Sequence, residues 1–150
     1  MASNSLSPAA LAYLGDAVCE LCVRELLVGL GFTSSARLNR FALDFVRASA
    51  QAEAVRHILP VLSEDEAAVF RRGRNHTIPN VPKSATMQEY RHATGFEVLL
   101  AALYVDGKTD RLHELFHLAY APQIAALRAE MGLPVEAGAA VDSDRKDSPS

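Results

Sequence analysis

The stretch that decides the fold runs from Leu11 to Leu21 and reads L-A-Y-L-G-D-A-V-C-E-L. Its apolar residues recur every three or four positions, which is the spacing of one helix face. Ser7 and Pro8 stand just before it; serine caps helix N-termini and proline fits the first turn. We therefore expect an amphipathic helix from about Pro8 to Leu30, closed by a pair of glycines. The apolar face holds Leu11, Leu14, Val18 and Leu21.

Two residues within this helix, Gly15 and Asp16, are poor choices for a helix interior. A glycine there indicates that another element or a ligand approaches the backbone. A carboxylate beside the apolar face costs free energy unless it is paired, protonated or bound to a metal. The residues alone leave two interpretations open: a capped or salt-bridged Asp16 on a closely packed helix, or a ligand-binding site.

Length and composition indicate one soluble domain. A chain of 150 residues can bury a sizeable core, and 49% hydrophobic with 22% charged residues is ordinary for a globular protein. No apolar run is long enough to cross a bilayer, and no secretory signal is visible. We expect a cytoplasmic protein with no membrane partner, or one from an organelle stroma if the chain is a processed form.

The two cysteines, Cys19 and Cys22, form a C-x-x-C pair on the first predicted helix. Such a pair occurs in redox and zinc sites, but zinc needs further ligands and none follows at a matching spacing. The pattern favours reduced, packed thiols.

Four more helical segments are predicted along the chain. Residues 36–59 have helical apolar spacing, and capping boxes at Ser63/Glu66 and Thr86/Glu89 begin two further helices. The second of these ends near residues 106–107. A last stretch runs from 109 to about 131 and is bent or split by Pro122.

The remaining segments complete an all-α domain without strands. Residues 75–85 contain two prolines and no periodicity, which predicts a loop. We expect a short tail over 1–7, one domain over 8–133, and a disordered Gly-, Ala-, Asp- and Ser-rich tail over 134–150.

Three blocks of sequence resemble one known family. The stretch beginning at Leu11 is similar to the signature helix of ribonuclease III, and its A-Y-L-G-D resembles the short branch called Mini-ribonuclease III. Residues 71–75, R-R-G-R-N, resemble a block of that branch. Residues 90–97, Y-R-H-A-T-G-F-E, followed by V-L-L-A-A-L-Y, resemble the second family motif. The blocks stand in the family's order and span roughly residues 8 to 130.

The resemblance implies that Asp16 and Glu97 are the catalytic acids and bind a divalent ion. Oxygen ligands favour Mg²⁺, with Mn²⁺ also possible. Such an ion lowers the pKa of a water that attacks the RNA phosphorus, leaving 5′-phosphate and 3′-hydroxyl ends. Read without the resemblance, Glu97 could instead form an ion pair with Arg91 or another arginine.

Two acidic positions of full-length ribonuclease III differ here, because Ala12 and Thr94 replace a glutamate and an aspartate. Both differences are typical of the Mini branch, and they leave the number of ions open. Glu20 and Thr94 are candidates for positions around the metal ligands. Glu20 could orient a metal-bound water, or could pair with Arg24 at the surface.

The arginine block predicts contacts with RNA phosphates, since guanidinium groups bind phosphate oxygens without reading sequence. The alternative is simple compensation of the helix dipole. Tyr13 and Tyr90 are expected to pack near the site; the alternative is that they stack on bases. The predicted RNA-binding residues are Arg71, Arg72, Arg74, Asn75, Lys83, Thr86 and Arg91.

One further pattern, H-E-L-F-H at residues 113–117, fits the zinc-peptidase motif H-E-x-x-H. The motif would assign zinc to His113 and His117 and activation of water to Glu114. No third ligand is evident, and a helix with a core face and solvated histidines explains the pattern more simply.

The predicted function is an endoribonuclease that cuts double-stranded RNA, with the large-subunit ribosomal RNA precursor as the substrate that the resemblance implies. The competing class is a catalytically silent RNA-binding or ribosome-associated module on the same fold. Full-length relatives carry a separate RNA-binding domain, for which the predicted tail is too short. The resemblance also implies a two-fold homodimer with the Leu11 helix near the interface, where Gly15 would allow close approach. A ribosomal protein helper is possible but unidentified.

Overall fold

The computed structural model describes residues 1–76 and 86–134, and all regular structure in these ranges is helical, as predicted. No helix among them is long and apolar enough to cross a membrane. The elements are η1 (Ser3–Ser5), α1 (Pro8–Gly29), α2 (Ser35–Val46), α3 (Ala48–Ile58), η2 (Leu59–Val61), α4 (Glu64–Arg74), α5 (Met87–Val105), α6 (Thr109–Ala119) and α7 (Ala121–Glu130).

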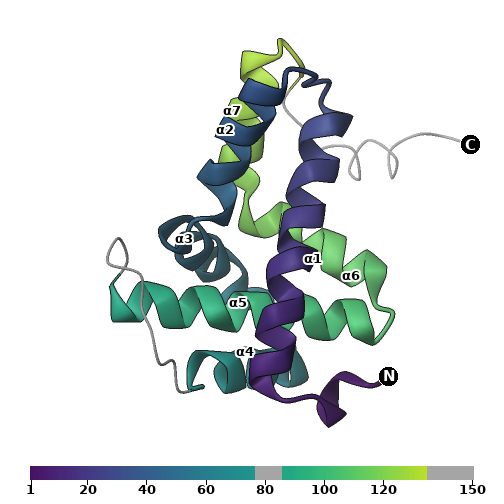
Figure 1. The fold of residues 1–150 in the computed structure, drawn as a ribbon, viewed down its shortest axis with the longest axis vertical. Helices are drawn as coiled ribbons and strands as arrows, with labels where there is room; N and C mark the ends of the chain where they lie inside the picture. The colour runs from purple at the N-terminus through teal and green to yellow at the C-terminus, as the bar shows by residue number, and fades with distance from the viewer. Residues whose placement is uncertain (77–85, 135–150) are drawn as a thin grey trace, which may run out of the picture.

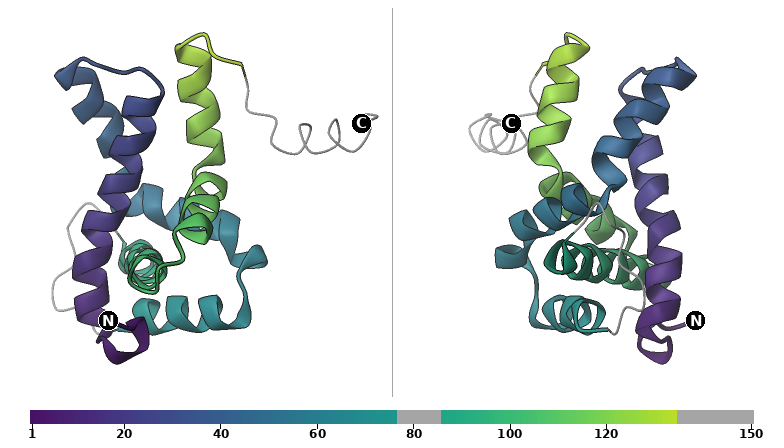
Figure 2. Two further views of the ribbon diagram at one scale, coloured as in Figure 1. Left: turned by 90° about the vertical axis from the view of Figure 1, so that its right-hand side faces the viewer. Right: turned by 60° about the vertical axis from the view of Figure 1, so that its left-hand side comes forward.

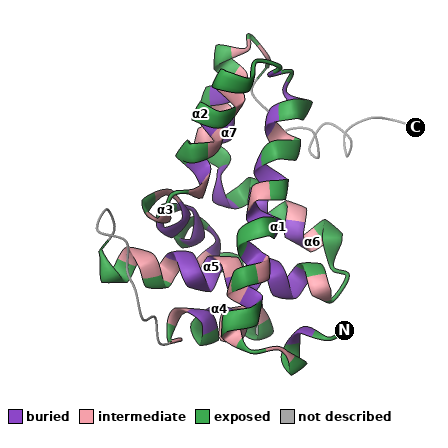
Figure 3. Ribbon diagram, in the orientation of Figure 1, coloured by how far each residue is buried: buried purple, intermediate pink, exposed green. Residues whose placement is uncertain are grey.

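Helix α5 is the central element, and α1, α3 and α4 pack around it (Figure 1). The left view of Figure 2 shows α5 end-on, with α1 at one side and α4 beneath. Ten of its residues are buried, from Ala93 to Leu103, and Figure 3 shows this burial along the ribbon. A helix that is apolar on most sides is typical of a core position.

The core is organised around Tyr120, which lies between α6 and α7 and is fully buried. Its ring centroid lies 4.9 Å from that of Phe45, 5.0 Å from Phe116 and 5.9 Å from Phe96. These aromatic contacts join α2, α5 and α6 into one core.

The predicted helix starts are confirmed by their caps. The Ser7 hydroxyl accepts from the Ala10 N–H at 3.1 Å. Both predicted capping boxes are present, at the start of α4 and of α5. The first helix ends where it was predicted to end, and Gly31 turns the chain with a φ of 101°. These signals act within one helical turn and are therefore readable from sequence.

The prediction of one helix over 36–59 is wrong. Arg47 has extended backbone angles, φ −65° and ψ 150°, and separates α2 from α3. No proline or glycine marks the break in the sequence. Helix α2 packs against α1, whereas α3 packs against α5 and α6. The two helices therefore have to run in different directions, which one continuous helix cannot do. The last stretch does split, at Tyr120, just before Pro122.

Two predicted segments fall mainly outside the described residues. The loop predicted over 75–85 is described only at its two N-terminal residues, and the tail predicted over 134–150 only at Pro134.

Candidate active site

The site is built where α1 crosses α5. Gly15 is buried, and a Cβ placed there would lie 2.0 Å from the carbonyl oxygen of Glu97 and 2.5 Å from its carbonyl carbon. No side chain fits in that space, so the glycine sets the distance between the two helices. Asp16 follows directly, and the crossing therefore brings it beside Glu97.

Asp16 and Glu97 form a carboxylate pair. Glu97 is half-buried and Asp16 is exposed. Burial, the neighbouring Asp16 charge and a hydrogen bond with Asp16 together raise the pKa of Glu97 to about 8. The pair therefore holds a proton at neutral pH, because two adjacent carboxylates do not both ionise unless a cation is near.

The donor set fits a hard divalent cation. Two carboxylates, one anchored in the core and one open to solvent, offer oxygen ligands, and Mg²⁺ in proteins is often held by one or two carboxylates together with waters and phosphates. No group of three or more His, Cys, Asp or Glu that could hold a metal occurs among residues 1–76 and 86–134. A cation at Asp16 and Glu97 would thus keep several positions for water and substrate.

The ion pair considered for Glu97 is absent. Arg91 is exposed, and no described ion pair involves Glu97. The metal interpretation therefore has no competing cation within the described part of the chain.

Comparison with known proteins identifies the family. Residues 9–108 match the Ribonuclease III domain. The chain belongs to the ribonuclease III family. It is an endoribonuclease by that membership, and the family is generally dependent on divalent metal ions.

Individual relatives refine this assignment. The chain is 46% identical to the Mini-ribonuclease 3 of Symbiobacterium thermophilum over 77% of its own length and 88% of that protein. It is 40% identical to the Mini-ribonuclease 3 of Enterococcus faecalis over 76% of its own length and 88% of that protein. A crystal structure of a Fusobacterium nucleatum protein superimposes with a TM-score of 0.72 at 28% identity, covering 79% of this chain and 94% of that one.

The two residues expected around the acids of this ribonuclease III-family site have other partners. Glu20 accepts from Arg24 Nη2 at 2.9 Å, so the surface pairing is the observed arrangement. Buried Thr94 donates its hydroxyl to the Tyr90 carbonyl oxygen at 2.9 Å, within its own helix.

The R-R-G-R-N block of this family member is partly a packing motif. A Cβ at Gly73 would lie 2.7 Å from Val98 and 2.9 Å from Gly95 Cα, and one at Gly95 would lie 2.7 Å from the Phe70 ring. Gly95 stands two residues before Glu97 and therefore on the opposite side of α5. Helix α4 accordingly packs on the face of α5 that points away from the carboxylates.

Arg72 of α4 points away from Arg71 and Arg74, which stand three residues apart and therefore share a side of the helix. Arg72 reaches toward the N-terminal segment, where its Nη2 donates to the Leu6 carbonyl oxygen at 3.5 Å. Arg74 stacks 5.8 Å from the Phe70 ring centroid and donates to Asn75 Oδ1. Arg71 is exposed on the outer side. The phosphate clamp stays a prediction, in which Arg72 already has the Leu6 carbonyl oxygen as a partner.

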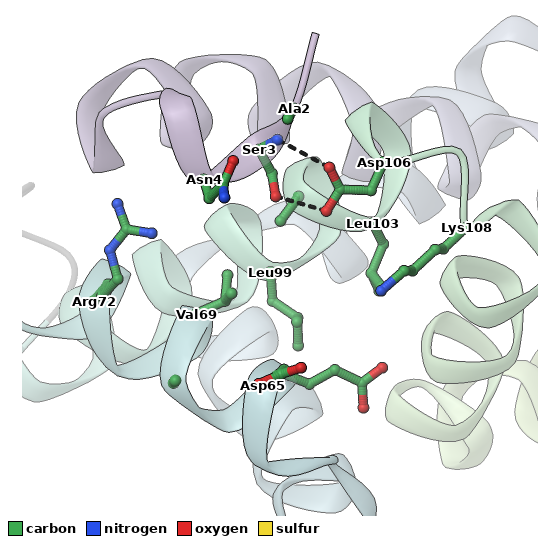
Figure 4. A pocket seen from close by; sticks show the side chains of 13 residues that line it. Ala2, Ser3, Asn4, Asp65, Val69, Arg72, Leu99, Leu103, Asp106 and Lys108 are labelled. Carbon is green, nitrogen blue, oxygen red and sulfur yellow. Dashed lines mark hydrogen bonds between the residues drawn. The ribbon is translucent and has the colours of Figure 1, made fainter.

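A cavity of about 490 Å³ lies beside Arg72, between η1, α4 and the C-terminal half of α5. Figure 4 shows the side chains that line it. Ser3 donates through its N–H and its hydroxyl to the Asp106 carboxylate, at 2.9 and 2.6 Å. The α5 residues that line the cavity include Leu99 and Leu103, on the side of the helix away from Glu97. The cavity is separate from the carboxylate pair.

Two other residues predicted to contact RNA are Thr86 and Lys83. Thr86 caps α5, its hydroxyl accepting from the Glu89 N–H at 3.0 Å. Lys83 lies outside the described residues.

The prediction that Tyr13 packs within the chain is wrong, because its side chain is 87% exposed; Tyr90 is half-buried. Tyr13 lies on the outer face of α1, as do exposed Leu21 and Val28. Gly15, proposed to permit close approach in a dimer, instead contacts α5 of its own chain.

The cysteines are buried and free, as predicted, and burial raises the pKa of Cys19 to about 12 and of Cys22 to about 11. The thiols therefore stay protonated at neutral pH.

The H-E-x-x-H residues lie on α6, whose core face is Leu112, Leu115, Phe116 and Ala119. His113 Nε2 is 3.7 Å from Glu25, and His117 Nδ1 is 2.8 Å from the His113 carbonyl oxygen. Within the ranges that the structure describes, no third metal ligand joins them.

Sequence reasoning missed Gln51 of α3, which is 3% exposed and whose Nε2 donates to Cys19 Sγ of α1 at 3.6 Å. The sequence could have indicated this residue, because Gln51 shares a helix face with the core residues Ala52 and Val55, where an amide side chain is unusual.

Proposed function

We propose that this enzyme hydrolyses double-stranded RNA with Mg²⁺ bound by Asp16 and Glu97. The observation that carries the proposal is the carboxylate pair at the crossing of α1 and α5, in which Glu97 is half-buried and Asp16 is exposed. Bound there, a divalent ion supplies a water of lowered pKa and neutralises charge on the phosphate.

Glu97 and Asp16 have distinct roles in the proposed reaction. Glu97 is held rigidly because its backbone packs directly on Gly15. Asp16 faces solvent and therefore the substrate. A cation held by the pair would require both carboxylates to be ionised, so the proton on Glu97 would be released to solvent. Attack by water with departure of the 3′ oxygen gives 5′-phosphate and 3′-hydroxyl ends.

We propose the large-subunit ribosomal RNA precursor as the physiological substrate, in the cytoplasm, because the sequence blocks are those of the Mini branch. A helper ribosomal protein belongs to the same hypothesis. Double-helical RNA is recognised through its shape, phosphates and 2′-hydroxyls, which suits a surface of exposed arginines such as Arg71.

The proposed working unit is a two-fold dimer. A duplex needs one cut in each strand, and a symmetric pair of chains presents one carboxylate pair to each. Tyr13, Leu21 and Val28 support a contact along the outer face of α1, because exposed apolar residues that share a helix face mark interaction surfaces.

The test is cleavage of a long RNA duplex by the purified chain and by the near-isosteric variants Asp16→Asn and Glu97→Gln, with Mg²⁺ or EDTA. We expect both variants to lose activity by roughly 1,000-fold or more, because the metal contributes several kcal/mol and each 1.36 kcal/mol is tenfold in rate. Helical circular dichroism should be unchanged, and duplex binding in Ca²⁺ should persist in at least one variant.

Full activity in either variant would rule out the metal assignment. Duplex binding without cleavage by the intact chain in Mg²⁺ and Mn²⁺ would favour the silent RNA-binding module. One tight zinc per chain, lost in His113→Ala, would instead support the peptidase alternative.

A further inference from the structure

Arg24 is the only basic residue of the 22-residue helix α1. Asp16, Glu20 and Arg24 follow one another at intervals of four residues, which places them along one side of the helix. They occupy the part of α1 that continues beyond its crossing with α5 (Figure 1). The third acid of α1, Glu25, faces α6, where its Oε2 lies 3.7 Å from His113 Nε2. The side of α1 that carries Asp16 therefore holds two acids and a single base.

The guanidinium group of Arg24 is oriented by Glu20. Its Nη2 and Nε donate to the same carboxylate oxygen, Glu20 Oε1, at 2.9 and 3.3 Å. Because Glu20 lies one turn nearer the N-terminus, these bonds turn the arginine back toward Asp16. The positive charge consequently lies near the level of Glu20, roughly 6 Å along the helix axis from Asp16.

Most of the hydrogen-bonding capacity of Arg24 is unused. A guanidinium group has five N–H donors, and Glu20 accepts from two of them, which leaves three. The side chain of Arg24 is 68% exposed, and within residues 1–76 and 86–134 Glu20 is its only side-chain partner. Arginine binds phosphate through two parallel N–H bonds, for which these donors suffice.

The charges around Arg24 point to an anion as its further partner. An RNA strand at the carboxylate pair meets three acids, Asp16, Glu97 and Glu20. The first two are the ligands of the proposed ion, whereas Glu20 alone would repel the next phosphate of the strand. Arg24 neutralises Glu20 and presents its remaining donors at the same place. An exposed ion pair contributes little to stability, so stability alone is a weak reason for a second acid one turn from Asp16.

We propose that Arg24 binds an RNA phosphate close to the one that is cleaved, and that Glu20 is the positioning residue that orients its guanidinium group. This inference rests on the proposed cleavage of RNA at Asp16 and Glu97. The contact stands on the same helix as Asp16, so it fixes the strand relative to the carboxylate pair. Phosphate contacts of this kind position RNA without reading its sequence.

The experiment measures binding of the full chain to a short RNA duplex in Ca²⁺, by fluorescence anisotropy at several salt concentrations. The two members of the pair are changed separately, as Arg24→Ala and Glu20→Gln, because glutamine keeps an acceptor for the guanidinium group. Arg56→Ala is the matched control, since Arg56 Nη1 lies 3.7 Å from Glu53 within α3 and its side chain is 48% exposed. Circular dichroism establishes that each variant is folded.

A second set of duplexes locates the phosphate. Each duplex carries one uncharged methylphosphonate linkage, placed at a different position near the cleaved bond. One of these positions should weaken binding by the parent but not by Arg24→Ala, because that variant has already lost the contact. Arg56→Ala should show the same dependence on position as the parent.

We expect Arg24→Ala to bind the unmodified duplex roughly tenfold more weakly, as for other hydrogen bonds between charged groups. Its dependence of log K on log salt should flatten by roughly one unit. Glu20→Gln should bind at least as tightly as the parent, because it removes a negative charge and keeps the arginine. The opposite effects of these two changes distinguish a phosphate contact from a surface ion pair, whose two members would be equivalent.

A parental salt slope in Arg24→Ala, or an unchanged dependence on methylphosphonate position, overturns the phosphate contact and leaves the proposed cleavage intact. Equal weakening by Arg24→Ala and Glu20→Gln overturns it as well. Full cleavage by Asp16→Asn and Glu97→Gln would instead overturn the proposed function, whatever the salt slopes of the Arg24 variant show.

Discussion

At the scale of single residues, Glu97 is held in an environment that opposes its charge. It is half-buried beside Asp16, and these two effects raise its pKa from 4.5 to about 8. In the unfolded chain the pKa of the Glu97 carboxyl group returns to its ordinary value. Folding therefore takes up a proton between these two pH values.

The stability of the metal-free protein should consequently depend on pH in a defined direction. The native pKa is the higher one, so the stability that protonated Glu97 contributes is fully present below about pH 4.5 and is lost as pH rises toward 8. We expect the melting temperature in EDTA to fall by several degrees across this window relative to Glu97→Gln, as followed by circular dichroism. Added Mg²⁺ should oppose the loss. Parallel pH profiles for the two proteins would contradict the raised pKa.

At the scale of elements, the crossing of α1 and α5 depends on the absence of a side chain. Gly15 and Gly29 both lie in α1, yet a Cβ at Gly15 meets the backbone of Glu97 at 2.0 Å whereas one at Gly29 meets nothing within 4 Å. Backbone cannot move aside as a flexible side chain can. Replacing each glycine by alanine therefore distinguishes the effect of helix propensity on stability from the effect of helix packing.

Gly15→Ala should lower the free energy of unfolding by about 1–3 kcal/mol or more, the usual cost of overpacking. Gly29→Ala should be neutral or slightly stabilising, because alanine favours the helix by up to about 1 kcal/mol. Urea unfolding of both variants measures the difference. Equal stabilities would show that α1 can shift on α5 at no cost.

Neighbouring Arg71 and Arg72 of α4 point in different directions, which gives a second prediction at this scale. Each phosphate contact contributes roughly one unit to the dependence of log K on log salt. Arg71→Ala should weaken duplex binding and flatten that slope by roughly one unit, since Arg71 is exposed. Arg72→Ala should change the slope less, since its guanidinium group bonds the Leu6 carbonyl oxygen. Fluorescence anisotropy at several salt concentrations measures both, and equal slopes for the two variants would show that both arginines contact phosphate.

At the scale of the whole molecule, the proposed dimer decides whether one binding event cuts both strands. A heterodimer of one intact chain and one Glu97→Gln chain should nick a duplex in one strand and leave the other whole, as read on denaturing gels. Leu21→Glu, on the exposed outer face of α1, should shift the protein toward monomer in sedimentation. A monomer that still makes double-strand cuts at low enzyme concentration would rule out the dimer.

The sequence by itself determined the helical class and the capped starts of α1, α4 and α5, and it named Asp16 and Glu97 as the candidate acids. Caps depend on residues within one turn, and the acids stand in family motifs, so neither requires knowledge of packing. Tertiary structure decided the rest. The break at Arg47, the contact of Gly15 with Glu97, the bond from Arg72 to Leu6 and the bond from Gln51 to Cys19 all depend on how segments far apart in sequence pack together. Apolar periodicity shows that a helix face is buried, but it does not show which partner covers that face.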